Sequence, residues 1–185
     1  MTQTPLTMAD STPTTPGKAA SRQDAGRAAF ADLLQRHRSL LAKVVGTYAW
    51  EAPNREDLGQ EIAVQLWRAW PSYDPGRPVS TWMYRIALNV AITWVRGHSR
   101  ELRHHEAWDD ARHDIADPLA HDPEAGQQVE LLYRFIHALP PLDRALMLLY
   151  LEDHSHREIG EVLGISEANA ATKISRLKQR IRQEL

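Results

Sequence analysis

The sequence has 185 residues, of which 43% are hydrophobic, and its 22 Lys and Arg residues against 24 Asp and Glu residues give a formal net charge of −2. A chain of this size can bury one modest core or two small ones, and two small ones fit this sequence better. No apolar run approaches the ~20 residues that a membrane span requires, and the N-terminus lacks the apolar centre of a signal peptide, so we expect a cytoplasmic protein without membrane insertion. The absence of cysteine excludes disulfides and thiolate metal sites.

The N-terminal residues 1–24 are rich in Thr, Pro, Ser and Ala without a periodic apolar pattern, which predicts a disordered tail. From Ala28 onward, apolar residues recur at helical spacing and predict one long amphipathic helix that ends by Pro53. Asn54 is then expected to cap a second helix that runs to Trp70. The buried stripe of this second helix is predicted to consist of Leu58, Ile62, Leu66 and Trp70.

A separate polar stripe of the second helix consists of Asp57, Gln60, Glu61 and Arg68. Charged stripes on helices are common, and most of them are solvated faces. The residues by themselves therefore favour a solvated face over a binding surface.

The segment from Tyr73 to Ser80 is dense in turn formers and predicts a loop, after which a third helix begins at Ser80 or Thr81. The core stripe of the third helix is expected to consist of Met83, Ile86, Ala87, Val90 and Trp94. A neighbouring side carries Trp82, Arg85, Asn89, Thr93 and Arg96. Stacking on an aromatic is worth roughly 1–3 kcal/mol per base and needs unpaired nucleotides, so this side suits single-stranded DNA. The alternative is that Trp82 merely closes the core.

Residues 99–125 lose the apolar periodicity, and residues 100–125 carry three basic against eight acidic side chains, which predicts a flexible acidic linker. The candidate metal ligands in this segment are His104, His105, His113 and His121. They lack the spacing of known metal motifs, and a flexible chain seldom preorganises a site. We therefore assign no metal site, no catalytic residue and no cofactor.

Beyond the linker, Val129, Leu132, Tyr133 and Ile136 indicate another helix, which Pro140 and Pro141 interrupt, and a short helix is expected from Leu142 to Glu152. Residues 155–182 then have the pattern of a helix-turn-helix. Its first helix contains Gly160, where close approach of the second helix would need a tiny side chain. The turn is predicted from Gly164 as a helix breaker, Ile165 at the corner and Ser166 as the next N-cap.

The second helix of this motif has two faces, because Ala170, Ile174 and Leu177 recur at helical spacing and can pack inward. The side chains expected to point outward, near the end of the helix that enters the major groove, are Asn169, Thr172, Lys173 and Arg176. A solvated basic C-terminal helix is the alternative. The agreement of the glycine spacing, the corner residue and the cap favours DNA binding.

Three motifs in this order resemble the bacterial RNA polymerase sigma factors of the extracytoplasmic-function class. They are REDLGQEIAVQLWRAW at 55–70, STWMYRIALNVAITWVR at 80–96 and LPPLDRALMLLYLEDHSHREIGEVLGISEANAATKISRLKQRI at 139–181. The resemblance implies an all-α fold with two small helical domains joined by the linker: a sigma-2 domain at 25–98 and a sigma-4 domain at 126–185, with residues 99–125 between them.

The resemblance also implies functions for the polar stripes. Asp57, Gln60 and Glu61 match positions that bind the clamp of the beta-prime subunit of core RNA polymerase. This implied function would replace the interpretation of the stripe as a solvated face. The residues that match positions binding the −10 element of promoter DNA and assisting its melting are Ser80, Trp82, Arg85 and Asn89. The sigma-4 domain would dock on the beta flap and read the −35 element through Asn169, Thr172, Lys173 and Arg176. An anti-sigma factor is a further expected partner.

Two other functions are compatible with parts of the sequence. A helix-turn-helix repressor that acts without stable binding to core polymerase would bind pseudo-palindromic sites as a dimer. A metal-dependent enzyme would use the linker histidines and would contain a bound metal. The resemblance favours a transcription initiation factor that is not itself an enzyme.

Overall fold

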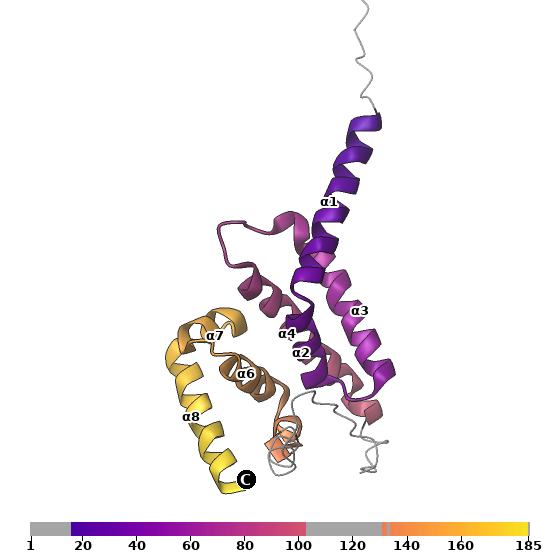
Figure 1. The fold of residues 1–185 in the computed structure, drawn as a ribbon. Coiled ribbons are helices and arrows are strands. Elements are labelled where there is room, and N and C mark those ends of the chain that lie inside the picture. The colour runs from indigo at the N-terminus through magenta and orange to yellow at the C-terminus, as the bar shows by residue number, and fades with distance from the viewer. Residues whose placement is uncertain (1–15, 103–130, 133, 185) are drawn as a thin grey trace, which may run out of the picture. The chain divides into compact units, whose positions relative to one another are not determined.

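The computed structural model describes residues 16–102, 131–132 and 134–184, and the regular structure in these ranges is helical throughout (Figure 1). The predicted all-α class is thereby confirmed. The chain divides into two compact units, with the boundary between Gln35 and Arg36.

The helix α1 (Pro16–Arg36) begins earlier than the apolar periodicity indicates. A proline is well suited to a helix start, because its fixed φ matches the first helical position, and the alanines that follow have high helix propensity. Residues 16–24 are therefore helical, which differs from the predicted disorder, and residues 1–15 lie outside the described residues. The expected single helix is also interrupted at His37, whose backbone angles (φ −107°, ψ 20°) separate α1 from α2 (Arg38–Tyr48).

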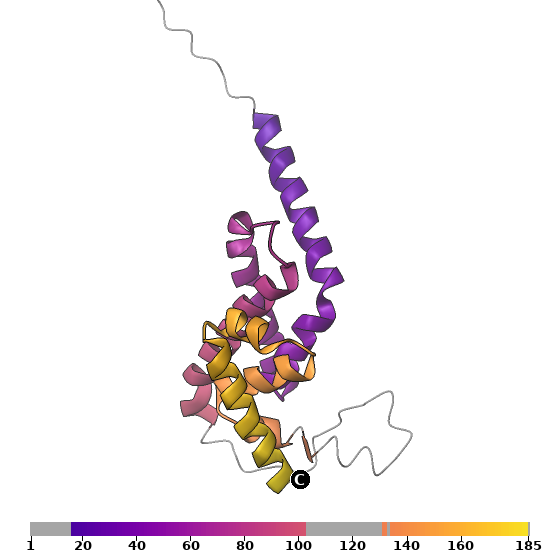
Figure 2. The same cartoon turned by 90° about the vertical axis from the view of Figure 1, so that its left-hand side faces the viewer.

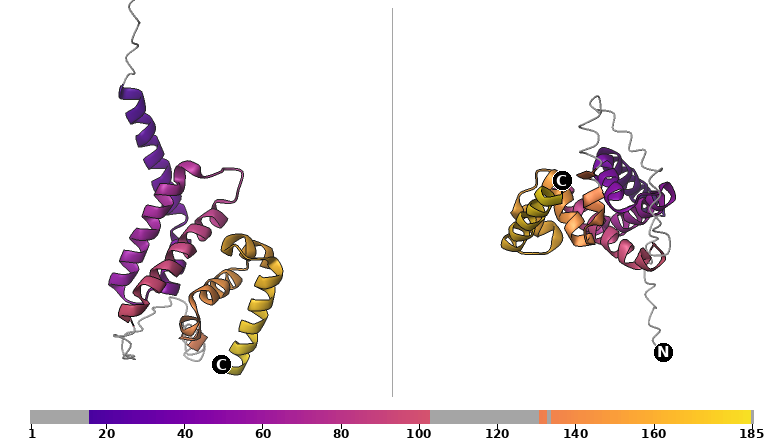
Figure 3. Two further views of the ribbon diagram at one scale, coloured as in Figure 1. Left: turned by 180° about the vertical axis from the view of Figure 1, so that it is seen from behind. Right: turned by 90° about the horizontal axis from the view of Figure 1, so that it is seen from below.

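Helix α2 packs with α3 (Ala52–Ala69) and α4 (Val79–Leu102) around a shared core. Figure 3 shows α3 and α4 side by side. The side chains at the centre of this core are at most 1% exposed and include Val44, Leu58, Ile62, Leu66 and Met83. Three of the four residues predicted for the buried stripe of α3 are thus in the core.

The two ends of α3 differ from the prediction. Glu51 occupies the N-cap position and Pro53 lies in the first turn, so Asn54 is inside the helix rather than at its cap. Proline favours this register, because its missing N–H costs nothing at the start of a helix. At the other end, Trp70 begins the 3-10 turn η1 (Trp70–Ser72) and is half-buried instead of belonging to the core stripe.

The buried side of α4 is rotated relative to the predicted stripe. Its buried residues are Met83, Tyr84, Ala87, Leu88, Ala91 and Ile92. Ile86, Val90 and Trp94, which the periodicity assigned to the core, are half-buried. Helix α4 contacts α2 and α3 and also α6 and α7, so its buried face is broader than one helical stripe.

The C-terminal helices are α6 (Pro141–Leu151), α7 (His156–Leu163) and α8 (Glu167–Glu184), and residues 131–132 and 134–138 before them are also helical. Figure 2 shows α8 lying across α6 and α7, both of which it contacts. The core between these helices contains Leu146, Leu149, Ile159, Ala170 and Ile174.

Local interactions define both ends of α7. The Ser155 side chain accepts a hydrogen bond from the Glu158 N–H, and the Glu158 carboxylate accepts one from the Ser155 N–H, which together form a capping box. The Ser155 hydroxyl also donates a hydrogen bond to the Glu158 carboxylate at 2.7 Å, and this bond, together with the one from the Ser155 N–H, lowers the pKa of Glu158 below its ordinary value. Gly164 ends the helix with φ +69°, a conformation that glycine adopts without steric cost.

The turn after α7 requires Gly160. A Cβ atom at this position would lie 2.7 Å from the carbonyl oxygen of Ile165 and 3.4 Å from the backbone nitrogen of Glu167. Ser166 caps α8 as predicted, because its hydroxyl accepts a hydrogen bond from the Asn169 N–H at 3.2 Å. The sequence predicts that the second helix passes close to Gly160. In the structure, the atoms that lie close to Gly160 belong to the backbone of the turn and of the first residue of α8.

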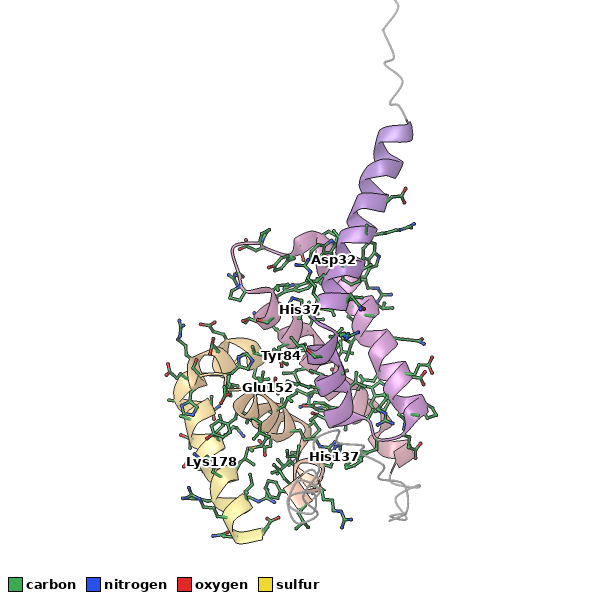
Figure 4. The ribbon with its side chains drawn as sticks, in the orientation of Figure 1. Asp32, His37, Tyr84, His137, Glu152 and Lys178 are labelled. Carbon is green, nitrogen blue, oxygen red and sulfur yellow. The ribbon has the colours of Figure 1, made fainter. Side chains whose placement is uncertain are left out.

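Within the second unit, side chains of α2 and α4 contact the C-terminal helices. The Tyr48 hydroxyl donates a hydrogen bond to the carbonyl oxygen of Pro141 at 2.6 Å, and Lys43 forms an ion pair with Glu152. Burial, with a smaller contribution from the Glu152 carboxylate, raises the pKa of Tyr84 to about 12; Figure 4 labels both side chains. The two groups of helices thus share polar contacts as well as apolar ones.

Candidate DNA and polymerase interfaces

The first candidate surface is the exposed face of α3. Asp57, Gln60 and Glu61 are all exposed on this helix. The Gln60 side chain donates to Glu56 at 3.5 Å, and Gln65 donates to Glu61 at 2.7 Å. The three residues predicted for polymerase binding therefore lie together on one face.

Two apolar side chains lie among these polar ones. Val64 and Trp67 are 42% and 38% exposed and follow Gln60 at spacings of four and seven residues, which places all three on one helix face. An apolar centre with a polar rim is the anatomy of a protein interface, whereas a solvated face needs no exposed Trp. The sequence interpretation missed Val64 and Trp67, although their spacing from Gln60 is visible in the sequence.

The second candidate surface begins with an aromatic cluster beside the loop that precedes α4. The rings of Trp70 and Tyr73 stack with centroids 5.6 Å apart, and Trp82 lies 6.1 Å from Trp70 and 5.0 Å from Tyr73. The Tyr73 hydroxyl donates to the carbonyl oxygen of Arg77 at 2.9 Å, which ties the loop to the cluster. Trp82 is half-buried, so it supports this cluster while keeping part of its ring accessible.

The remaining candidates for single-stranded DNA extend this surface along α4. Arg85 and Asn89 are exposed and share a helix face with Trp82, because they follow it at spacings of three and seven residues. Ser80 is half-buried in the first turn, and its spacing of two residues from Trp82 places it on another side of the helix. The structure brings three of the four residues together and separates Ser80 from them.

The third candidate surface is α8, whose inward residues Ala170, Ile174 and Leu177 are buried as predicted. Asn169, Thr172 and Arg176 are exposed, and the Thr172 hydroxyl donates to the carbonyl oxygen of Ala168 at 2.8 Å. Ser175, which the sequence interpretation did not include, is exposed beside them. These small polar side chains and one guanidinium can hydrogen-bond base edges and phosphates in a major groove.

Lys173 differs from the other three residues predicted for α8. It is half-buried, and its ammonium group lies 3.6 Å from a carboxylate oxygen of Asp143 on α6. The sequence placed this side chain on the outward face, because the tertiary partner on α6 was not visible from the spacing.

Two other points from the sequence, the candidate metal ligands and the membrane spans, do not concern these surfaces. The linker histidines lie outside the described residues, and the part of the chain that the structure describes contains no group of three or more side chains suited to hold a metal ion. In the same part of the chain, no helix combines the length and the apolar character that crossing a membrane demands.

Comparison with protein families gives two matches that follow one another along the chain. Residues 33–101 match Sigma-70 region 2, and residues 130–181 match Sigma-70, region 4. The first match contains α2, α3 and all of α4 except its last residue, and the second contains α6, α7 and α8 as far as residue 181. All three candidate surfaces therefore lie inside matched regions.

The curated relatives of this chain are RNA polymerase sigma factors. The chain is 30% identical over 134 residues to the probable RNA polymerase sigma factor RfaY of Xanthomonas campestris, and 26% identical over 171 residues to the ECF RNA polymerase sigma factor SigE of Mycolicibacterium smegmatis. It is 30% identical over 129 residues to the ECF RNA polymerase sigma factor SigM of Bacillus subtilis. These matches cover 70%, 90% and 69% of this chain, and 34% of RfaY, 65% of SigE and 77% of SigM.

Two solved structures share the fold. One is CnrH in complex with the cytosolic domain of CnrY, with a TM-score of 0.61 and 21% identity over 89% of this chain and 92% of that one. The other is the sigma factor RpoE in complex with the anti-sigma factor NepR from Bartonella quintana, with a TM-score of 0.62 and 17% identity over 83% of this chain and 94% of that one.

Proposed function

Since the chain belongs to the RNA polymerase sigma factors of the extracytoplasmic-function class, we propose that it binds core RNA polymerase, directs the enzyme to particular promoters and assists their melting. Both sigma-70 regions are present in the order that this task needs, with region 2 before region 4. The chain is then a transcription initiation factor that acts in the cytoplasm with the polymerase. Its catalytic partner is the polymerase itself.

The observation that carries the proposal is the exposed face of α3 in a chain that contains both sigma-70 regions. An apolar patch with a polar rim also fits the interface of a dimeric repressor, so the patch supports a polymerase contact together with the family matches and not by itself. A chain that must be held by a polymerase subunit needs such a patch, because interfaces exclude water at an apolar centre. We assign Asp57, Gln60 and Glu61 to the rim of the polymerase contact and Val64 and Trp67 to its centre.

The two DNA surfaces divide the promoter between them. Trp82, Arg85 and Asn89 are assigned to the −10 element, where partly exposed indole and amide groups can hold unpaired bases. Asn169, Thr172 and Arg176 are assigned to the −35 element, which remains a duplex and is read in the major groove. Ser80 is assigned to the first turn of the −10 surface, outside the stripe that begins at Trp82.

An inhibitory protein partner is a further part of the proposal. Two solved neighbours of this fold are described as complexes, one with the cytosolic domain of CnrY and one with an anti-sigma factor. We infer that this chain is also held inactive by an anti-sigma factor that covers one or more of the three surfaces.

The experiment that tests the function needs a promoter and a polymerase. Holoenzyme assembled from the full chain and bacterial core RNA polymerase would capture fragments of genomic DNA, and the captured fragments would serve as templates for run-off transcription. We expect specific transcripts with the holoenzyme and none with core enzyme, and we expect Asp57→Ala combined with Gln60→Ala to reduce them. Arg38→Ala, a change at an exposed site on α2, is the matched control. Binding of the chain as a dimer to a palindromic duplex, without affinity for core enzyme, would contradict the proposal.

A further inference from the structure

The positive charges of α8 differ in what they contact. The helix carries five basic side chains, which are Lys173, Arg176, Lys178, Arg180 and Arg182. Three of the five contact other side chains of the described chain. Lys173 pairs with Asp143, the Lys178 ammonium lies 5.2 Å from the centre of the Tyr150 ring, and the Arg180 guanidinium lies 5.5 Å from the Phe135 ring and pairs with Glu184.

The pair between Lys173 and Asp143 connects α8 to the start of α6. The Lys173 ammonium nitrogen lies 3.6 Å from the Asp143 carboxylate, and the two side chains are 35% and 23% exposed. Asp143 belongs to the first turn of α6, where unpaired backbone N–H groups favour a negative charge. A partly buried pair of this kind is less screened by salt than an exposed one.

The position of Lys173 on α8 determines which part of a DNA duplex it could reach. The inward side of the helix contains Ala170 and Ile174, and helical spacing places Lys173 on the flank that faces α6. Thr172 and Ser175 lie farther round and are exposed. A side chain on the flank of a recognition helix is suited to the sugar-phosphate backbone, whereas side chains at its outward centre reach base edges.

We propose that Asp143 sets the affinity of the −35 surface for DNA by holding Lys173 away from the phosphate backbone. Asp143 is then a positioning residue that acts through a neighbouring cation and does not itself touch DNA. Of the three residues assigned to the −35 element, Arg176 is then the one charged side chain that contacts the duplex. The inference rests on the −35 assignment of α8 made under the proposed function.

The dependence of promoter binding on salt measures the number of phosphates that the protein neutralises. Each neutralised phosphate on a duplex contributes a slope of about −0.9 to the logarithm of the binding constant against the logarithm of salt concentration. Asp143→Asn keeps the shape of the side chain and removes its charge, so it frees Lys173 to bind one phosphate. The slope should become steeper by about 0.9, which corresponds to an additional loss of affinity of about 3.5-fold between 50 and 200 mM salt.

The experiment compares wild-type holoenzyme with Asp143→Asn, Lys173→Gln and the double variant on one duplex promoter fragment over a range of salt concentrations. We expect the steeper slope for Asp143→Asn, and the wild-type slope for Lys173→Gln and for the double variant. Asp153→Asn removes an exposed carboxyl in the turn after α6 and should leave the slope unchanged. Asp143→Ser, a shorter neutral side chain, gives a second variant whose result must agree with that of Asp143→Asn.

Each other result has a definite meaning. A shallower slope for Lys173→Gln would overturn the proposal, because Lys173 would then already contact a phosphate in the wild type. A steeper slope that persists in the double variant would overturn it as well, because the carboxylate would then act by repelling DNA. Failure of the wild-type holoenzyme to bind any duplex promoter would overturn the proposed function itself, whereas equal slopes in all four proteins would overturn only the role of Asp143.

Discussion

The backbone of Ile165 folds back onto Gly160. The Ile165 N–H donates a hydrogen bond to the Gly160 carbonyl at 3.1 Å, and the Ile165 carbonyl oxygen lies 2.7 Å from the place where a Cβ of residue 160 would be. The neighbouring atoms are backbone atoms, which cannot rotate away as the end of a flexible side chain can. The turn of the helix-turn-helix therefore depends on the absence of a side chain at this position.

Gly160→Ala should destabilise the chain by about 1–3 kcal/mol, because a methyl group would force the turn backbone to move. Urea unfolding followed by circular dichroism measures the change. Gly46→Ala is the matched control, since no atom lies within 4 Å of its added Cβ, and Ala at this helical site should stabilise by roughly 0.5–1 kcal/mol. A Gly160→Ala variant as stable as the wild type would show that the turn can adjust.

The capping box of α7 should make part of the stability depend on pH. Hydrogen bonds from the Ser155 side chain and backbone lower the pKa of Glu158 below its ordinary value of 4.5 in the folded chain. A carboxyl with a depressed folded pKa stabilises the fold above its unfolded pKa, and this stabilisation is lost as the pH falls through the folded pKa. The free energy of unfolding of Glu158→Gln should therefore be lower than that of the wild type at pH 7, and the difference should shrink below pH 4.5.

The matched control for this experiment is Glu161→Gln, an exposed site on the same helix outside the capping box. A difference between wild type and Glu158→Gln that does not change with pH would mean that the charge of Glu158 is not involved. Measuring each variant against wild type at the same pH removes the contribution of the other carboxyl groups.

Trp67→Ala should weaken binding of the chain to core RNA polymerase by about 2 kcal/mol or more, roughly 30-fold, because a tryptophan at the centre of an interface often dominates its energy. Circular dichroism of the variant checks that the fold is kept, because this side chain is 38% exposed and the rest of it packs against the chain. Fluorescence anisotropy of the labelled full chain titrated with core enzyme measures the affinity. Val64→Ala should have a smaller effect in the same direction, and unchanged affinity of both variants would exclude α3 from the interface.

Arg176→Ala and Trp82→Ala should respond differently to a template that is already open. Loss of a good base contact by Arg176 should weaken duplex binding by about 1–3 kcal/mol, and a pre-melted bubble at the −10 element should not restore it. Loss of the Trp82 ring should slow melting, so the bubble should recover much of the transcription. If the bubble rescues both variants to the same extent, the two surfaces do not divide the promoter as assigned.

Much of the fold follows from spacing alone. The neighbours of α3 (α2 and α4) and those of α8 (α6 and α7) lie on one side of each helix, so a single stripe identified Leu58, Ile62, Leu66 and the inward residues of α8 correctly. The same reasoning misplaced the buried face of α4, because a helix with neighbours on several sides buries more than one stripe. The start of α3 was also misplaced, because a proline in the first turn outweighed the preference of Asn54 for a cap position.

The candidate surfaces could be predicted to the extent that they depend on one helix. Asp57, Gln60 and Glu61 share a face because of their spacing, and the structure has them exposed there. The pairing of Lys173 with Asp143 could not be predicted, because it joins residues that are thirty positions apart in the sequence. Spacing within a helix carries no information about such a tertiary partner.

The exposed Val64 and Trp67 have a consequence for the amount of this protein in a cell. Apolar surface that is covered only in a complex favours self-association when the protein is present in excess of its partner. Partner binding, in contrast, stabilises the bound chain by mass action and lowers the fraction that a protease can attack. The lifetime of the chain should therefore rise with the concentration of available polymerase. Copies in excess of the polymerase would be degraded, which keeps the amount of this chain close to the amount of core enzyme.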